Sequence, residues 1–201
     1  MNLTAFYPVL ADKLGPHAGI SRLLKQAVLV VAGITLLAVA AKISVPAWPS
    51  PVPITMGSFA VLTIGAAYGA RLGLATILGY MIIGALGYDV FAGSSAEQAG
   101  VAYMMGGTGG YLVGYVLATL TLGALATRGW DRSFVWMALA MLIGNAMIYV
   151  PGLLWLGQLH GWDKPILAWG LTPFLMGDAL KLLLAAVILP LAWKLVGDAR
   201  R

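Results

Sequence analysis

Long apolar runs separated by short polar breaks make up most of the chain after residue 22. A helix needs about 20 mainly apolar residues to cross the hydrocarbon core of a bilayer, and six runs approach or exceed that length. The last begins at "TPF", where Thr172 is a favourable N-cap and Pro173 a favourable first helical residue. We predict six transmembrane helices, at residues 23–43, 53–68, 71–87, 107–127, 133–157 and 173–195.

The composition indicates the same environment. Of 201 residues, 61% are hydrophobic and 9% are charged, whereas a soluble domain is about 45–50% apolar and about 25% charged. Lipid must therefore be the solvent for most of the surface. We expect an all-α fold forming one membrane domain over residues 1–201, with no removable signal peptide and, since cysteine is absent, no disulfide framework.

The basic residues indicate how the chain is oriented. Nine of the 12 Lys and Arg residues fall in the two terminal segments and in the turns at 68–71 and 128–132. The opposite loops hold only Lys42 and Lys164, and Lys181 lies inside a predicted helix. The positive-inside rule then predicts cytoplasmic termini, and it explains the net charge of +5 without a nucleic-acid partner.

The predicted outer segments are longer than the cytoplasmic turns and are rich in Pro, Gly, Ser and Trp. Residues 44–57 contain a stiff, proline-rich stretch that suits either a fixed cover over a cavity or a plain connector. Residues 87–100, "GYDVFAGSSAEQAG", are the most polar outer stretch and are typical of a mobile lid.

Two charges inside the sixth predicted helix are the main candidates for a functional site. Asp178 and Lys181 are three residues apart and share one helix face. Inserting one charge at bilayer depth costs at least about 2.5–3.5 kcal/mol. An exposed ion pair at this spacing stabilises a helix by only a few tenths of a kcal/mol. The pair is either a packing feature of the bundle or a binding site for a small polar metabolite.

A proton relay is a further interpretation of the pair, but the other predicted helices offer almost no titratable groups. Asn145 and Tyr149, four residues apart on the fifth helix, are the evident polar companions. A helix–helix hydrogen bond within the bundle would explain them equally well.

The stretch "GGTGGYLVGY", residues 106–115, opens the fourth predicted helix. It is not a phosphate-binding loop, because no "GK[ST]" follows it and no strand precedes it. Close packing, a tight turn or an anion at the helix start would each use its glycines. Any ATP dependence must come from other chains.

Five ordered motifs carry a resemblance to a known family: "PVPIT", "GARLG", "GALGYDVFAG", "GTGGYLVGY" and "GDALK", between residues 51 and 181. Together they resemble the BioY family, the biotin-binding S components of energy-coupling factor (ECF) transporters. The resemblance implies a six-transmembrane-helix bundle with an outward-facing ligand pocket covered by external loops. It also implies partner subunits, namely a transmembrane scaffold and two ATPases.

The resemblance also implies which residues contact the ligand. The polar contacts would fall on Asp178 and Lys181, and the pocket and lid contacts on Phe91, Ala92, Gly93, Thr108, Gly109, Tyr111 and Tyr149. The chain departs from the family at Gly57, where a glutamine is expected. Its first helix also lacks the Ala-x-x-x-Ala ridge that S components offer their scaffold subunit.

Biotin suits the charged pair as a transported ligand, with no cofactor required. Asp178 would accept hydrogen bonds from the ureido N–H groups, and Lys181 would reach either the ureido carbonyl or the carboxylate of the tail. The alternatives are an S component for another vitamin, a membrane enzyme using Asp178 or His160 as acid or base, and a purely structural subunit. With two histidines and no cysteine, no metal cluster is expected.

Overall fold

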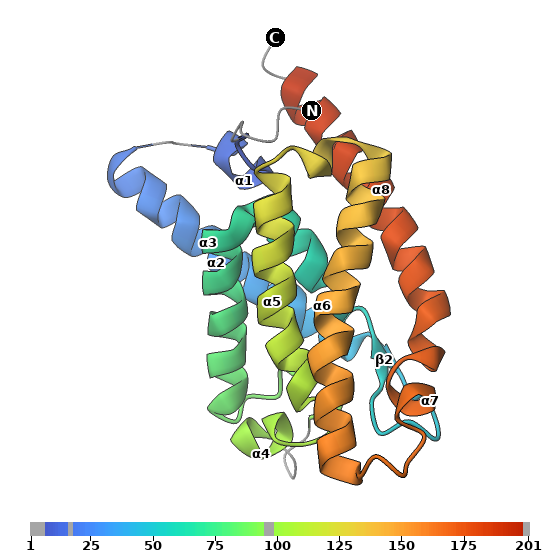
Figure 1. Ribbon diagram of the computed structural model, residues 1–201. Coiled ribbons are helices and arrows are strands. Elements are labelled where there is room, and N and C mark those ends of the chain that lie inside the picture. Colours follow the sequence, from blue (N-terminus) through green and yellow to red (C-terminus); the bar gives the residue numbers. More distant parts are fainter. Residues whose placement is uncertain (1–6, 16–17, 95–98, 199–201) are drawn as a thin grey trace.

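The structure, a computed structural model, describes residues 7–15, 18–94 and 99–198, and almost all of its regular elements are helices (Figure 1). The all-α prediction is confirmed. The helices are α1 (Leu10–Lys13), α2 (Gly19–Lys42), α3 (Gly57–Ala85), α4 (Gly100–Met104), α5 (Gly109–Ala126), η1 (Trp130–Arg132), α6 (Phe134–His160), α7 (Ile166–Gly170), η2 (Thr172–Phe174) and α8 (Leu175–Asp198).

Five stretches of the described chain are helical, long and apolar enough to cross a membrane. They are Gly19–Lys42, Gly57–Ala85, Gly109–Ala126, Phe134–His160 and Ile166–Gly197. The protein is therefore a multi-pass membrane protein. The sequence predicts six spans, and the difference arises because the second and third predicted spans both fall within α3.

Helix α3 is broken at Gly69, where the sequence predicts a turn. Gly69 has φ 75° and ψ 174°, a conformation outside the helical region that glycine adopts readily. A Cβ built on Gly73 would lie 3.6 Å from the Cα of Gly65, although residues eight apart in a straight helix are about 12 Å apart. The two arms of α3 thus fold back against each other, as Figure 1 shows in teal and green.

The core of the bundle forms where α3, α5 and α6 approach closely. A Cβ at Gly114 of α5 would lie 2.6 Å from the Cα of Ile148 on α6, and one at Gly123 would lie 2.2 Å from the backbone nitrogen of Ala70. Helices in lipid associate through such small residues, because no hydrophobic effect drives them together. The glycines of the apolar runs therefore set how tightly the core packs.

Helix α2 lies at the edge of this core. Only 17% of the residues in its most apolar stretch are buried, against 61% for α5. It packs against the second arm of α3, where a Cβ at Gly33 would lie 2.6 Å from the side chain of Thr76. Most of the side chains of α2 face outward.

The described chain begins and ends at the same end of the bundle, where α1, η1 and the last turns of α8 lie together (Figure 1). We call this the terminal end and the opposite one the distal end. The guanidinium of Arg132 donates to the carbonyl of Pro8 at 3.1 Å, which ties η1 to the segment before α1. Of the basic residues assigned to the cytoplasm, Arg200 and Arg201 lie outside the described residues.

The distal end holds the connections that the sequence identifies as outer loops. Strands β1 (Ser44–Val45) and β2 (Ile54–Thr55) pair antiparallel, with Ser44 opposite Thr55. The strand pair delays the start of α3 to Gly57, so the predicted helix start at residue 53 is wrong. In the predicted lid at 87–100, residues 95–98 lie outside the described residues.

The approach to the last helix also differs from the prediction. The 3-10 turn η2 occupies residues 172–174, and α8 begins at Leu175. The hydroxyl of Thr172 donates back to the carbonyl of Leu167 at 3.2 Å, so it does not cap the helix. The short helix α7 and this turn carry the chain across the distal end, and α8 then runs back to the terminal end.

Candidate ligand-binding site

A cavity lies at the distal end between α3, α5, α6 and α8 and the loops that join them. Small-molecule sites are typically concave and mostly apolar, with a few placed polar groups. The wall of this cavity is of that kind, since aromatic and aliphatic side chains surround a few polar ones. Seven of the nine predicted site residues line it: Phe91, Ala92, Thr108, Tyr111, Tyr149, Asp178 and Lys181.

The charged pair sits in the wall of this cavity. The Nζ of Lys181 lies 2.9 Å from Oδ1 of Asp178, and the two side chains are only 10% and 8% exposed. Lys181 also donates to the hydroxyl of Ser58 at 3.0 Å. The hydroxyl of Tyr149 donates to the other carboxylate oxygen, Oδ2. Each charge therefore has partners from a second helix.

The local sequence explains why the acid tolerates this place. Asp178 lies in the first turn of α8, where the partial positive charge of the helix N-terminus favours a carboxylate. Lys181 follows three residues later on the same face. In contrast with an exposed pair, a buried pair is sustained only when hydrogen bonds satisfy its remaining donors and acceptors.

The pair keeps hydrogen-bonding capacity for a further molecule. A carboxylate has about four acceptor positions and an ammonium group three donors. Asp178 uses two acceptor positions, for Lys181 and Tyr149, and Lys181 uses two donors, for Asp178 and Ser58. A ligand in the cavity could therefore bond to both residues without breaking the pair.

Aromatic side chains form much of the apolar wall. The rings of Tyr111 and Tyr149 meet edge to face, with centroids 6.4 Å apart and planes at 86°. Phe174 of η2 packs against Tyr149, with centroids 6.3 Å apart. The hydroxyl of Tyr111 donates to the carbonyl of Gly170 at 2.8 Å, which ties α5 to α7. Asn145, one turn before Tyr149, also lines the cavity.

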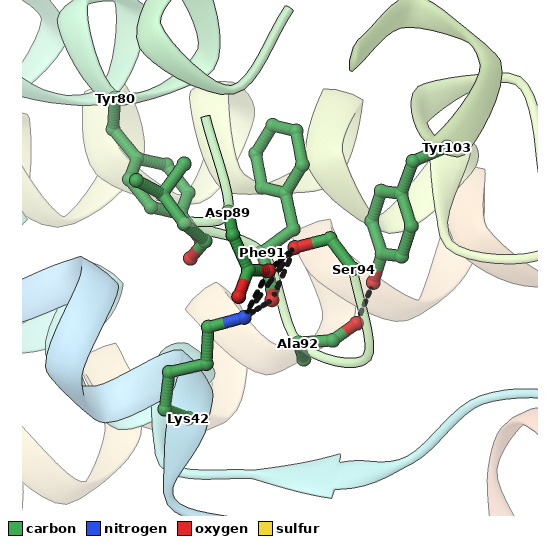
Figure 2. Close-up of polar contacts among 8 residues, drawn as sticks. Lys42, Tyr80, Asp89, Phe91, Ala92, Ser94 and Tyr103 are labelled. Atoms are coloured by element: carbon green, nitrogen blue, oxygen red, sulfur yellow. Dashed lines mark hydrogen bonds and ion pairs between the residues drawn. The ribbon is translucent and has the colours of Figure 1, made fainter. Parts of the chain in front are cut away.

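The segment 89–94, between α3 and α4, contributes Phe91 and Ala92 to the cavity wall, and Figure 2 shows its polar contacts. The ring of Phe91 is 1% exposed. It stacks on Tyr103 at 5.2 Å between centroids, with planes at 12°, and meets Tyr80 edge to face at 5.2 Å. A Cβ at Gly84 would lie 2.1 Å from the Phe91 ring, so the glycine leaves room for it.

The profile of the BioY family matches residues 12–198, nearly the whole chain. The chain belongs to the BioY family. The probable biotin transporter BioY of Pyrococcus horikoshii is 38% identical over 164 residues, which cover 82% of this chain and 93% of the relative. The biotin transporter BioY of Thermotoga maritima is 35% identical over 163 residues, covering 80% and 92%. The resemblance noted in the sequence is thereby confirmed.

A solved structure has the same fold. The S-component for biotin from an ECF-type ABC transporter superposes with a TM-score of 0.73, covering 88% of this chain and 95% of that one. The two sequences are 19% identical, so this likeness bears on the fold alone.

Two residues that the BioY resemblance predicts as contacts, Gly93 and Gly109, do not line the cavity. Gly93 has φ 71° and lies beside a neighbouring hollow. A Cβ at Gly109 would lie 2.2 Å from the carbonyl oxygen of Met104, so this glycine permits a close backbone approach at the start of α5. Both shape the loops around the cavity.

Other lining residues were not predicted. Ser58 bonds to Lys181 across 123 residues of sequence, and Thr55 and Tyr115 line the wall beside Gly57. A Cβ at Gly57 would lie 3.0 Å from each of the Thr55 and Tyr115 hydroxyl oxygens. Two hydroxyls thus crowd the position where the resemblance led us to expect a glutamine. Nothing local in the sequence marks these positions as neighbours.

Proposed function

We propose that the protein captures biotin at its distal end, outside the cell, and mediates its uptake as the substrate-binding subunit of an ECF transporter. The observation that carries the proposal is the Asp178–Lys181 pair, buried in the wall of a largely apolar cavity. Biotin combines an apolar body with a ureido group that both donates and accepts hydrogen bonds. The names of the curated BioY relatives support this ligand.

The site residues divide by chemistry. Asp178 accepts from the ureido N–H groups, and Lys181 donates to the ureido carbonyl or the tail carboxylate. Tyr149 keeps the Asp178 carboxylate in place through its hydroxyl. Phe91, Ala92, Tyr111 and Thr108 form the walls, while Gly93 and Gly109 act indirectly through the conformation of the loops.

The topology we propose has six membrane crossings in a single domain, with the two arms of α3 counted separately. The break at Gly69 and the close approach of Gly65 and Gly73 support this count. The terminal end then faces the cytoplasm of a bacterial cell, as the distribution of basic residues predicts. The cavity opens to the outside, and lipid surrounds the exposed apolar faces.

A transmembrane scaffold subunit and two ATPase subunits would supply the energy for uptake. The chain itself carries no phosphate-binding loop, and the solved structure of similar fold is an S-component from an ECF-type ABC transporter. The role is that of a transporter subunit, since neither a catalytic constellation nor a cofactor is needed to bind and release biotin.

Equilibrium binding of labelled biotin to the purified protein in detergent tests this proposal. We expect saturable binding that unlabelled biotin displaces and that thiamine or riboflavin does not. Displacement by one of these vitamins but not by biotin would assign the protein to another S component. Uptake by cells expressing the chain with and without the ECF module then tests the partners.

A further inference from the structure

Lys42, the last residue of α2, lies at the distal end, and its side chain extends to segment 89–94 (Figure 2). Its ammonium pairs with the carboxylate of Asp89 and donates to the carbonyl of Phe91 at 2.9 Å. It also lies 3.4 Å from the hydroxyl of Ser94. Ser94 in turn donates to Asp89 at 2.5 Å and lies 2.9 Å from the Phe91 carbonyl.

Side chains from three elements hold consecutive carbonyl groups of this segment. Tyr80 of α3 donates to the carbonyl of Val90 at 3.0 Å, Lys42 of α2 donates to that of Phe91, and Tyr103 of α4 donates to that of Ala92. A segment outside regular secondary structure must find partners for its backbone groups elsewhere. Here those partners fix the segment that carries Phe91 and Ala92 into the cavity wall.

Helix α2 also connects to the other covering loop. The backbone nitrogen of Met56 donates to the carbonyl of Ile43, one residue after Lys42, at 3.1 Å, and Ala41 lines the cavity. The buried residues of α2 lie in its distal half, at Gly33, Leu37, Ala40 and Ala41, so this end of the helix is packed against the bundle as well as bonded to both loops. A displacement of α2 would therefore pull directly on both loops.

We propose that Lys42 is a positioning residue for ligand retention: it ties the distal end of α2 to segment 89–94 and so holds Phe91 and Ala92 against the bound molecule. The inference rests on the proposed function, since it names the residue that keeps biotin in its site. Lys42 itself is not among the residues that line the cavity.

The carboxylate of Asp89 stays charged at neutral pH. Hydrogen bonds from Lys42 and from Ser94 hold the pKa of the Asp89 carboxyl below its ordinary value. Since the Lys42 and Asp89 side chains are 38% and 58% exposed, the ion pair alone contributes little. The larger part of the stabilisation comes from the hydrogen bond that Lys42 donates to the backbone carbonyl of Phe91, a residue of the cavity wall.

Biotin dissociation from the purified protein measures this role. We expect Lys42→Met to speed dissociation about three- to tenfold, and Asp89→Asn to act in the same direction with a smaller effect. Lys42→Arg, which keeps the charge and a hydrogen-bond donor, should keep biotin dissociation nearly as slow as in the parent. The matched control is Lys164→Met, which removes the 3.1 Å ion pair with Asp163 on another distal loop and should leave the rate unchanged.

A second readout does not depend on the ligand. The chain has no cysteine, so Val90→Cys provides a single thiol on the segment, and its maleimide labelling without biotin reports how firmly the segment is held. Adding Lys42→Met should raise the labelling rate severalfold. Equal labelling and equal dissociation rates with and without Lys42 would overturn the inference. If the protein binds no biotin but Lys42→Met still raises the labelling rate, the proposed ligand is wrong and the contact between Lys42 and segment 89–94 remains supported.

Discussion

Two aspartates are buried at opposite ends of the molecule, and their surroundings differ sharply. Asp178 at the distal end is 7% exposed and Asp131 of η1, at the terminal end, is 1% exposed. Asp178 has a lysine and a tyrosine as partners and lines the cavity. Asp131 accepts one bond, from the indole of Trp193 at 2.5 Å, and its other oxygen has no partner among the described residues.

The difference supports the proposal that Asp178 binds the ligand, whereas Asp131 has a structural role. Burial raises the pKa of Asp131 to about 6, and the bond from Trp193 and the nearby charge of Arg132 only partly oppose this. Asp131 has the charge of Arg132 nearby, but its side-chain hydrogen bond comes from a neutral indole and not from a cation. Asp178 keeps a cation 2.9 Å away inside the bundle, an arrangement that packing alone does not require. Burial by itself therefore does not identify a functional carboxylate.

Removing the charge of Lys181 should have the largest effect on biotin affinity. We expect Lys181→Met to weaken biotin binding by about two decades, because it deletes a ligand donor and leaves the Asp178 carboxylate buried without its partner. Binding of labelled biotin in detergent measures this. Leu184→Met, an exposed position of α8, is the control and should bind as the parent does. A Lys181→Met protein of parental affinity would place the ligand elsewhere.

A smaller effect is expected from the hydroxyl that orients the carboxylate. Tyr149→Phe keeps the ring packed against Tyr111 and Phe174 but removes the bond to Asp178. We expect a three- to tenfold loss of biotin affinity, in keeping with a hydrogen bond to a charged group. Tyr111→Phe, whose hydroxyl bonds to the Gly170 carbonyl, should change affinity less. The opposite order would assign the polar contact to Tyr111.

At the terminal end, substitution should change stability and leave binding alone. Because the pKa of Asp131 is raised in the folded protein to about 6, folding takes up a proton between roughly pH 4 and pH 6. Its contribution to stability is greatest below that window and falls as pH rises through it. Asp131→Asn should remove this dependence and raise the melting temperature above pH 6, with biotin affinity unchanged. Parallel melting curves for both proteins from pH 4 to 8 would contradict the assignment.

The apolar runs and the buried charges could be predicted from the sequence. Membrane helices depend on composition over about 20 residues, and the i,i+3 spacing of Asp178 and Lys181 places both on one face of any helix. The turn at Gly69 could likewise be placed, because its flanking runs are each long and apolar. Local patterns were sufficient for these features.

The remaining contacts depend on tertiary structure. Lys42 meets Asp89 across 47 residues and Lys181 meets Ser58 across 123, and no local pattern connects such positions. Asp131 lies in a short polar turn that would be expected to face water, yet Trp193 covers it. Gly93 and Gly109 were predicted from family motifs, which do not distinguish a residue that touches the ligand from one that shapes the loop.

The most direct test replaces the whole pair with neutral side chains of similar size, Asp178→Asn together with Lys181→Met. Replacing both members of a buried ion pair leaves no uncompensated buried charge, which is the main cost of removing one member alone. If the pair exists for the ligand, the double variant should melt no lower than the parent and lose at least about two decades of biotin affinity. A double variant that binds biotin within threefold of the parent would show that the pair serves the bundle and not the ligand.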